Sequence, residues 1–238
     1  MRKVLFFPIV MLTFSIPAVS FAEEVAKSGK SDLGAAVIAP VSDEGGFNWE
    51  GYYAGATIGY GFGETEQIYD RAGNHGPATL KPDGLSAALT IGANWMYSPH
   101  LLLGVEGDLG SLGVSQGTTT VFDGHNWSSH FGGFATLRGR AGYVIDNTLL
   151  YGTAGLAVAS IENISIGNTA PETAIEDGLN AGWVIGFGAE YAVNHNWTVK
   201  GEFLHMDFGK VEGKSANNED FSFEDKVNVV RMGANYKF

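Results

Sequence analysis

The sequence predicts an all-β fold, an eight-stranded antiparallel transmembrane β-barrel with up-and-down meander topology, from three observations. Apolar residues alternate with small or polar ones in eight segments after Trp49, as in strands that have one apolar face. These segments suit the roughly 9–11 residues that a tilted strand needs to cross a bilayer. Short turns and long polar segments alternate between them.

Composition supports a barrel and excludes several function classes. The 238 residues include 34 glycines and 12% aromatics, but only 17% charged residues, which is unusual for a soluble enzyme. The chain has no cysteine, so disulfides and thiolate metal sites are excluded. A net charge of −12 argues against nucleic acid as a partner, because phosphate binding needs concentrated Lys and Arg.

The N-terminus predicts export. Arg2 and Lys3 precede an apolar stretch, and Ser20-Phe21-Ala22 fits the small-x-small rule for cleavage. We therefore expect a signal peptide at 1–22, a periplasmic N-terminal linker at 23–48 and an outer-membrane β-barrel at 49–238. A membrane anchor helix is the weaker alternative, because the apolar stretch is short and Pro17 lies where a spanning helix would need to continue.

The eight strands are predicted in order from their period of two. The sixth is the clearest, with Trp183 and Ile185 on one face against Gly182 and Gly186 on the other. The fifth is apolar on both faces, so its phase stays open. The predicted strands are 52–62, 85–95, 101–110, 136–143, 150–158, 179–191, 197–203 and 230–238.

The connections predict the orientation. Outer-membrane barrels have short periplasmic turns and longer extracellular loops, and an even strand count puts both barrel ends on the periplasmic side. The expected turns are 98–100, 146–147 and 194–196, and the expected long loops are 64–84, 112–129, 162–178 and 209–225.

Charges within the strands fall on the small-residue face. Lipid must contact the apolar face, so the charged face should line the lumen. Eight strands leave an interior about filled by side chains, which predicts a salt-bridged core rather than an open pore. We expect Glu106 or Glu202 to pair with Arg138, Arg140 or Arg231. The predicted lumen charges are Glu106, Asp108, Arg138, Arg140, Glu190, Lys200, Glu202 and Arg231, with Lys237 as a fifth base.

A soluble β-sandwich or a lipocalin-like barrel is the alternative fold, and both would put the apolar face inside. Glycine on the polar face favours a crowded narrow lumen instead. Aromatic residues also gather near strand ends, as interfacial girdles require. They are Trp49, Tyr52, Trp95, Tyr143, Tyr191, Trp197 and Tyr236.

Several motifs resemble a known family. The terminal run 230–238, with Tyr236 and Phe238, resembles the outer-membrane assembly signal. The opening run 47–61 resembles the first strand of small porin-like surface proteins of α-proteobacteria, which are OmpA-like eight-stranded barrels. Runs 136–143, 149–157 and 200–209 are similar to strands four, five and seven of that family. The chain departs mildly from the pattern, with Phe203 and His205 where the family usually has tyrosines.

The resemblance implies a location more than an activity. It implies the outer membrane of a Gram-negative bacterium, with membrane lipid, the barrel-assembly machinery and a host or environmental ligand as partners. It implies a structural or surface-interaction role, with no catalytic residues. A narrow porin or a haemin-binding receptor is the alternative, because some relatives are described as porin-like or haemin-binding.

Haem is the sharper ligand hypothesis, and no other cofactor and no metal is predicted. Loop 112–129 carries little charge but holds His125 and Trp127, with His130 just after it; imidazole can ligate haem iron. The plainer interpretation is that Trp127 anchors the loop at the membrane interface. His205 and Asp207 share a strand face, but no nucleophile motif accompanies them, so an enzyme is not predicted.

Overall fold

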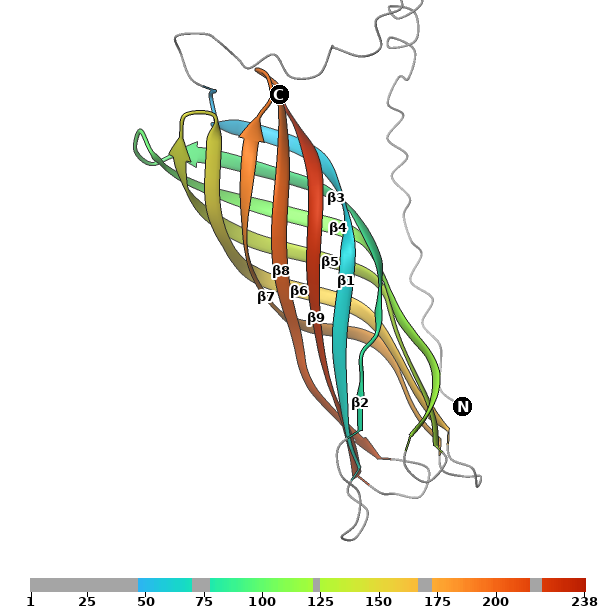
Figure 1. Cartoon of the computed structure of the whole chain (residues 1–238). Coiled ribbons are helices and arrows are strands. Elements are labelled where there is room, and N and C mark those ends of the chain that lie inside the picture. The colour runs from blue at the N-terminus through green and yellow to red at the C-terminus, as the bar shows by residue number, and fades with distance from the viewer. Residues whose placement is uncertain (1–46, 70–77, 122–124, 167–172, 215–219) are drawn as a thin grey trace, which may run out of the picture. The chain divides into compact units, whose positions relative to one another are not determined.

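The computed structural model describes residues 47–69, 78–121, 125–166, 173–214 and 220–238 (Figure 1). The predicted signal peptide and most of the predicted linker lie outside these ranges and stay predictions. None of the described residues forms a helix with the length and hydropathy of a membrane span.

Eight long antiparallel strands close into a barrel, which confirms the predicted fold class (Figure 1). The barrel closes because β9 pairs with β1, from Lys237 opposite Tyr53 to Phe221 opposite Tyr69. One further, short strand, β2 (Ala78–Leu80), pairs with β1 at residues 65–67, near the end of β1. The long strands are β1 (Gly51–Tyr69), β3 (Asp83–Met96), β4 (Leu101–Val121), β5 (His125–Ile145), β6 (Thr148–Ile166), β7 (Thr173–Ala192), β8 (Trp197–Lys214) and β9 (Asp220–Lys237).

The three predicted short turns are confirmed, and they lie at the end of the barrel that holds both Gly51 and Lys237. The β5–β6 hairpin turns through Asp146, whose φ of 52° is the positive value that tight hairpins use. In the β7–β8 turn, Asn194 Oδ1 accepts hydrogen bonds from the backbone N–H groups of Asn196 (3.0 Å) and Trp197 (2.9 Å). By the outer-membrane pattern this is the periplasmic end.

The prediction of four long loops at the other end is wrong in extent. The strands continue well past the predicted boundaries, for example to Val121 in β4 and from His125 in β5. The remaining connections, 70–77, 122–124, 167–172 and 215–219, lie outside the described residues. Beyond the membrane a strand's outer face meets water, so polar residues there resemble a loop although the backbone is paired.

The outward face carries an apolar band. On β1 it runs through alternate residues from Tyr52 to Phe62 and ends at the exposed Glu64. The fifth predicted strand, whose phase the sequence left open, is part of β6. Its Leu150 and Leu156 side chains point outward and that of Tyr151 points inward. Polar residues bound the band on the extracellular side; they are Glu64, Asp83, Ser111, His130, Glu162, Asp207 and Lys226.

An aromatic girdle marks the periplasmic boundary. Tyr52, Trp95, Tyr143, Tyr191, Trp197 and Tyr236 are all exposed there, as predicted. Trp49 is the exception, with only 3% of its surface exposed. It packs in a T-shaped contact with Phe47 and joins the buried cluster at the periplasmic mouth, so its assignment to the girdle was wrong. It precedes β1, and the chain there folds across the lumen rather than along the wall.

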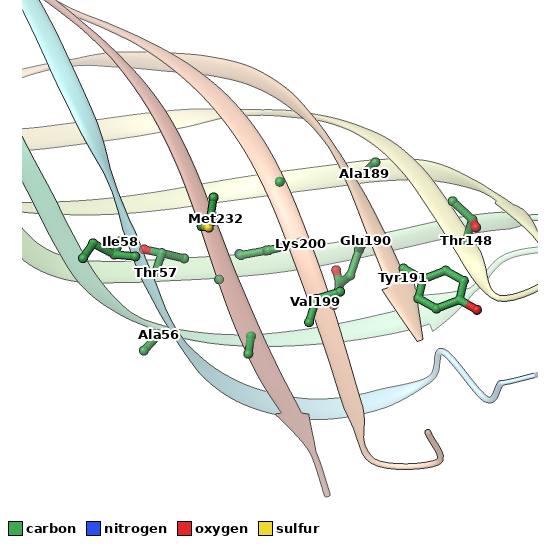
Figure 2. A pocket seen from close by; sticks show the side chains of 13 residues that line it. Ala56, Thr57, Ile58, Thr148, Ala189, Glu190, Tyr191, Val199, Lys200 and Met232 are labelled. Atoms are coloured by element: carbon green, nitrogen blue, oxygen red, sulfur yellow. The ribbon is translucent and has the colours of Figure 1, made fainter. Parts of the chain in front are cut away.

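A shallow hollow of about 710 Å³ lies over β1, β7, β8 and β9, with Thr148 of β6 at its border (Figure 2). Its lining is mainly apolar residues whose side chains point outward, including Ala56, Ala189 and Met232. At Gly201 an added Cβ would meet nothing within 4 Å. This hollow belongs to the outward apolar band, where acyl chains would cover it.

Beyond the membrane the strand pairing of the described residues divides the barrel wall into two half-sheets. Pairing between β7 and β8 ends at Trp183 opposite Asp207, although β7 begins ten residues earlier at Thr173. Pairing between β3 and β4 ends at Asp83 opposite Ser115. The extracellular parts of β4–β7 therefore form one group, and those of β8, β9, β1 and β2 form another (Figure 1).

Candidate functional site

The lumen is filled by side chains in four successive layers. The periplasmic mouth holds an apolar cluster that includes Trp49, Leu102 and Leu149. Above it lie the charge network, then a second apolar cluster that includes Leu112, Phe131 and Met206, and last a polar cluster around Asp225. The layers follow from alternate residues of single strands: β9 presents Asp225, Val227, Val229, Arg231 and Asn235 inward, all buried.

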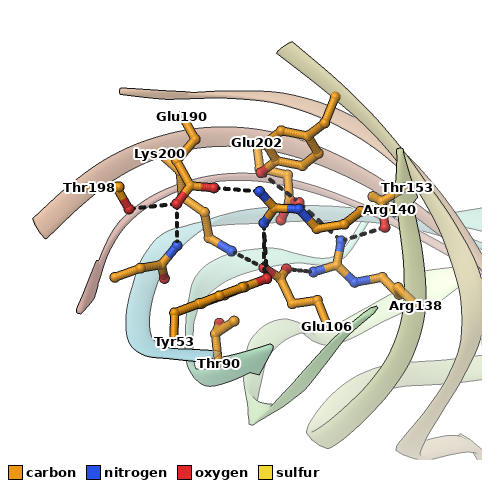
Figure 3. Close-up of polar contacts among 12 residues, drawn as sticks. Tyr53, Thr90, Glu106, Arg138, Arg140, Thr153, Glu190, Thr198, Lys200 and Glu202 are labelled. Atoms are coloured by element: carbon orange, nitrogen blue, oxygen red, sulfur yellow. Dashed lines mark hydrogen bonds and ion pairs between the residues drawn. The ribbon is translucent and has the colours of Figure 1, made fainter. Parts of the chain in front are cut away.

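The structure brings all eight predicted lumen charges together, with four acids and four bases (Figure 3). Arg138 is the centre of this network and is 1% exposed. Its guanidinium donates to Glu106, to Asp108 Oδ2 (2.8 Å) and to Glu202 Oε1 (3.0 Å). These acids come from β4 and β8, so Arg138 on β5 ties opposite walls of the barrel together.

Arg140 forms the periplasmic part of the network. It donates to Glu190 Oε2 (2.8 Å) and Glu106 Oε2 (3.3 Å). Its guanidinium carbon lies 4.5 Å from the ring centre of Tyr151 and 5.4 Å from that of Tyr53. Stacking on aromatic faces suits a planar, weakly hydrated cation that is held out of water.

Lys200 and Arg231 complete the network from β8 and β9. Lys200 Nζ lies 2.9 Å from Glu106 Oε2. Arg231 donates to Glu202 Oε2 through Nε (2.7 Å) and to Asp108 Oδ2 through Nη2 (2.9 Å). Both predicted acids, Glu106 and Glu202, therefore pair with predicted arginines.

Neutral side chains that the sequence reasoning did not assign to the network satisfy the remaining carboxylate oxygens. Tyr53 OH donates to Glu106 Oε2 (2.8 Å), and Tyr151 OH donates to Glu202 Oε1 (3.1 Å). Such bonds matter because a buried ion pair is stable only when its other polar atoms are also satisfied. The other donors are Thr90 and Thr136 to Asp108, and Thr198 and Asn235 to Glu190. The strand phase could have identified these residues, because each occupies a position that alternates with the outward apolar residues of its strand.

Lys237 does not join the network, which corrects its assignment to the lumen charges. Its ammonium lies 5.6 Å from the ring centre of Phe47 at the periplasmic mouth. It is the last residue of β9 and lies at the mouth of the lumen, outside the buried charge network, where water reaches it. Without Lys237, the buried network has four acids and four bases, so its charges balance.

A second polar cluster lies in the extracellular part of the lumen, where the sequence predicted loops. Thr65 Oγ1 donates to Asp225 Oδ1 (2.7 Å), and Asn163 Nδ2 donates to Asp225 Oδ2 (3.1 Å). Thr65 Oγ1 also lies 3.4 Å from Ser129 Oγ. The cluster therefore joins the inner faces of the two half-sheets across the lumen.

The three residues proposed for haem lie along β5. His130 is exposed on the outward face, at a register position opposite Ser115 and Glu162. The backbones of His125 and Trp127 belong to β5, but their side chains lie outside the described residues. Haem binding stays a prediction. Among the described residues no group of three or more His, Cys, Asp or Glu could hold a metal ion.

The two predicted assembly residues both point outward at the end of β9. Tyr236 contacts the rings of Trp197 and Phe238, with centroids 5.2 and 5.5 Å away. Phe238 N–H donates to the carbonyl of Tyr52 (3.1 Å), so the last residue is tied to the first strand. Their part in assembly stays a prediction.

A closed antiparallel barrel with an apolar outer band, an aromatic girdle and a charged, filled interior defines a small outer-membrane β-barrel protein. Residues 33–238 match the family described as outer membrane protein beta-barrel domain. The chain belongs to this family and resides in the outer membrane of a Gram-negative bacterium. The match also begins within the predicted linker.

Curated relatives agree with this assignment. A 31 kDa outer-membrane immunogenic protein of Brucella melitensis is 34% identical over 222 residues, covering 87% of this chain and 90% of the relative. A 22 kDa outer membrane protein of Rhizobium leguminosarum is 29% identical, covering 84% and 82%. Among solved structures, the outer membrane protein OprG of Pseudomonas aeruginosa aligns with a TM-score of 0.46 at 11% identity, covering 79% of this chain and 98% of that one.

Proposed function

We propose that this outer-membrane protein is a closed, non-conducting barrel whose task is to hold extended β-hairpins at the cell surface. The observation that carries the proposal is the filled lumen: apolar layers lie on both sides of a neutral, fully buried charge network. A narrow porin would need a continuous column of water, which those layers oppose.

The charge network supports rigidity rather than transport. An ion that crossed the barrel would have to displace Arg138, which binds acids on β4 and β8 at once. Breaking a buried pair costs about 3–5 kcal/mol because it leaves an uncompensated charge. A scaffold that presents hairpins needs this stiffness beneath them.

We also propose that the protein has no catalytic activity. His205 Nδ1 lies 2.8 Å from Asn228 Oδ1, and Asp207 Oδ1 instead accepts a hydrogen bond from the N–H of Gly209 (2.8 Å). The two residues therefore bind other partners, and no described hydroxyl bonds to His205. A general base needs a nucleophile within hydrogen-bond reach.

Liposome swelling tests the proposal. Vesicles that contain the refolded protein should admit neither small sugars nor amino acids faster than protein-free vesicles. The matched variant replaces Leu112, Phe131 and Met206 with glycine, which empties the upper apolar layer without touching a charge. Faster swelling in that variant alone supports a plug, whereas swelling with the parent protein contradicts it.

A further inference from the structure

The outward face of β1, β7, β8 and β9 carries an elongated groove. The hollow of about 710 Å³ continues into a second hollow of about 850 Å³. The residues that line both are Ile58, Ala189, Gly201 and Met232. On β9 the lining of the groove runs from Ala234 to Val230. At about 3.3 Å per residue this length is about 13 Å, close to the roughly 15 Å that the acyl chains of one bilayer leaflet cover.

Small residues form the floor of the groove. Ala56, Ala189 and Gly201 all lie on the outward face and are exposed. A Cβ added at Gly201 would meet nothing within 4 Å, so the space above the backbone is open there. The longer side chains of Phe187 and Met232, also exposed, border this floor. The groove is therefore concave and apolar.

Three hydrogen-bond donors lie at the periplasmic rim of the groove. Thr148 of β6 is directly opposite Tyr191 of β7, and both line the hollow (Figure 2). Trp197 is exposed at the start of β8, two residues before Val199, which also lines the hollow. Hydroxyl and indole N–H groups at this depth face the interface, where the ester and phosphate oxygens of lipids accept hydrogen bonds.

An exposed acid lies beside these donors. Asp146 occupies the β5–β6 turn, two residues before Thr148. A carboxylate at this rim attracts an ammonium group and repels additional negative charge. The charge therefore favours a headgroup that carries an amine over one that is only anionic.

We propose that this groove retains one phospholipid of the periplasmic leaflet, with an amine headgroup. One acyl chain lies in the groove, the ester or phosphate oxygens accept hydrogen bonds from Thr148, Tyr191 and Trp197, and the ammonium lies beside Asp146. The groove is continuous with the outward apolar band, which membrane lipid covers, so its occupant comes from the same lipid.

A flexible acyl chain fits this groove better than a second copy of the barrel does. Two copies that met through the same concave face would enclose a void and lose the packing contacts that hold an interface together. The lipid site is separate from the proposed display function, and neither depends on the other.

Native mass spectrometry tests the proposal. The folded barrel is placed in vesicles that contain equal amounts of phosphatidylethanolamine and phosphatidylglycerol with the same acyl chains, and is then released into mild detergent. One phosphatidylethanolamine should stay bound to each barrel, at higher occupancy than phosphatidylglycerol. No retained lipid, equal retention of the two lipids, or a lipid-free dimer overturns the proposal.

Filling the groove tests its location. Gly201→Leu places a side chain in the open space of the groove and should abolish retention of the lipid. The matched variant Gly107→Leu adds the same group on β4, outside the groove, where an added Cβ would make only ordinary contacts, and should retain the lipid. Equal retention by the two variants overturns the proposal.

Variants at the rim test recognition of the headgroup. Asp146→Asn keeps a residue type that tolerates the φ of 52° in the turn, and should reduce the preference for phosphatidylethanolamine roughly two- to fivefold. The double variant Y191F/T148V removes two hydroxyls and should lower the occupancy of the lipid. The control Tyr97→Phe removes an exposed hydroxyl just after β3 and should change neither quantity. An unchanged lipid preference in Asp146→Asn, or unchanged occupancy in Y191F/T148V, overturns the proposal.

Discussion

Gly92 faces the ring of Tyr53 across the β1–β3 pair. A Cβ added at Gly92 would lie 2.2 Å from Tyr53 Cζ, so glycine is needed for the tyrosine to reach Glu106. Gly92→Ala should therefore lower the free energy of unfolding by about 1–3 kcal/mol through overpacking. Urea titration in lipid vesicles measures this change. Gly201→Ala is the control, because its added methyl meets only lipid; equal stability of the two variants would contradict this packing.

Glu106 contacts more cations than any other acid in the described network. Arg138, Arg140, Lys200 and Arg231 all lie within 4.0 Å of its carboxylate. Glu106→Gln should destabilise the barrel by about 3–5 kcal/mol, because it leaves the buried cations in excess. The same urea titration measures this loss.

The double variant E106Q/K200M restores the balance of charge and should recover part of that loss. The surface variant E64Q should stay within about 0.5 kcal/mol of the parent. A fully stable E106Q protein would show that the network contributes nothing to the fold.

β9 is the element that closes the barrel, and the exposed Phe238 directly follows its last residue. Deletion of Phe238 should lower the amount of heat-modifiable, folded protein in outer-membrane fractions, because the terminal aromatic resembles the assembly signal. Phe187→Ala removes a ring that is also exposed on the outward face, and it should assemble normally. Parent-level folding of the Phe238 deletion would reject the assembly role.

The β4–β5 hairpin carries the haem hypothesis. Replacing His125 and Trp127 with alanine should leave the barrel folded and inserted, and should reduce haemin binding or cell adhesion. The matched variant H100A/W95A removes the same residue types at the periplasmic end and should leave either activity intact. Binding of haemin and of cells equal to the parent would dismiss this hairpin as the ligand site.

Individual elements differ in how far their sequence predicted them. Strands within the membrane were predictable because lipid imposes strict alternation, as between Trp183 and Gly182. The extracellular strand extensions were not, because water on their outer face removes that constraint. Asn163, Ser129 and Asp225 fell in predicted loops for this reason, and the cluster that joins the half-sheets was missed.

The lumen shows the same limit for the molecule as a whole. Phase alone assigned all eight network charges to the interior, since lipid excludes them from the other face. It could not assign Lys237, whose phase matches theirs but whose position at the end of β9 puts it at the mouth. Nor could it assign Trp49, because the chain before β1 leaves the strand pattern and folds over the lumen. Position along the barrel axis, which alternation does not encode, decided both.

Single-channel recording on the refolded protein in planar lipid bilayers tests the central claim most directly. The filled lumen predicts no discrete conductance steps at either polarity, with insertion verified by heat-modifiability of the same preparation. Stable, ohmic steps from the folded protein would mean that a continuous water column crosses the charge network, and would contradict the account.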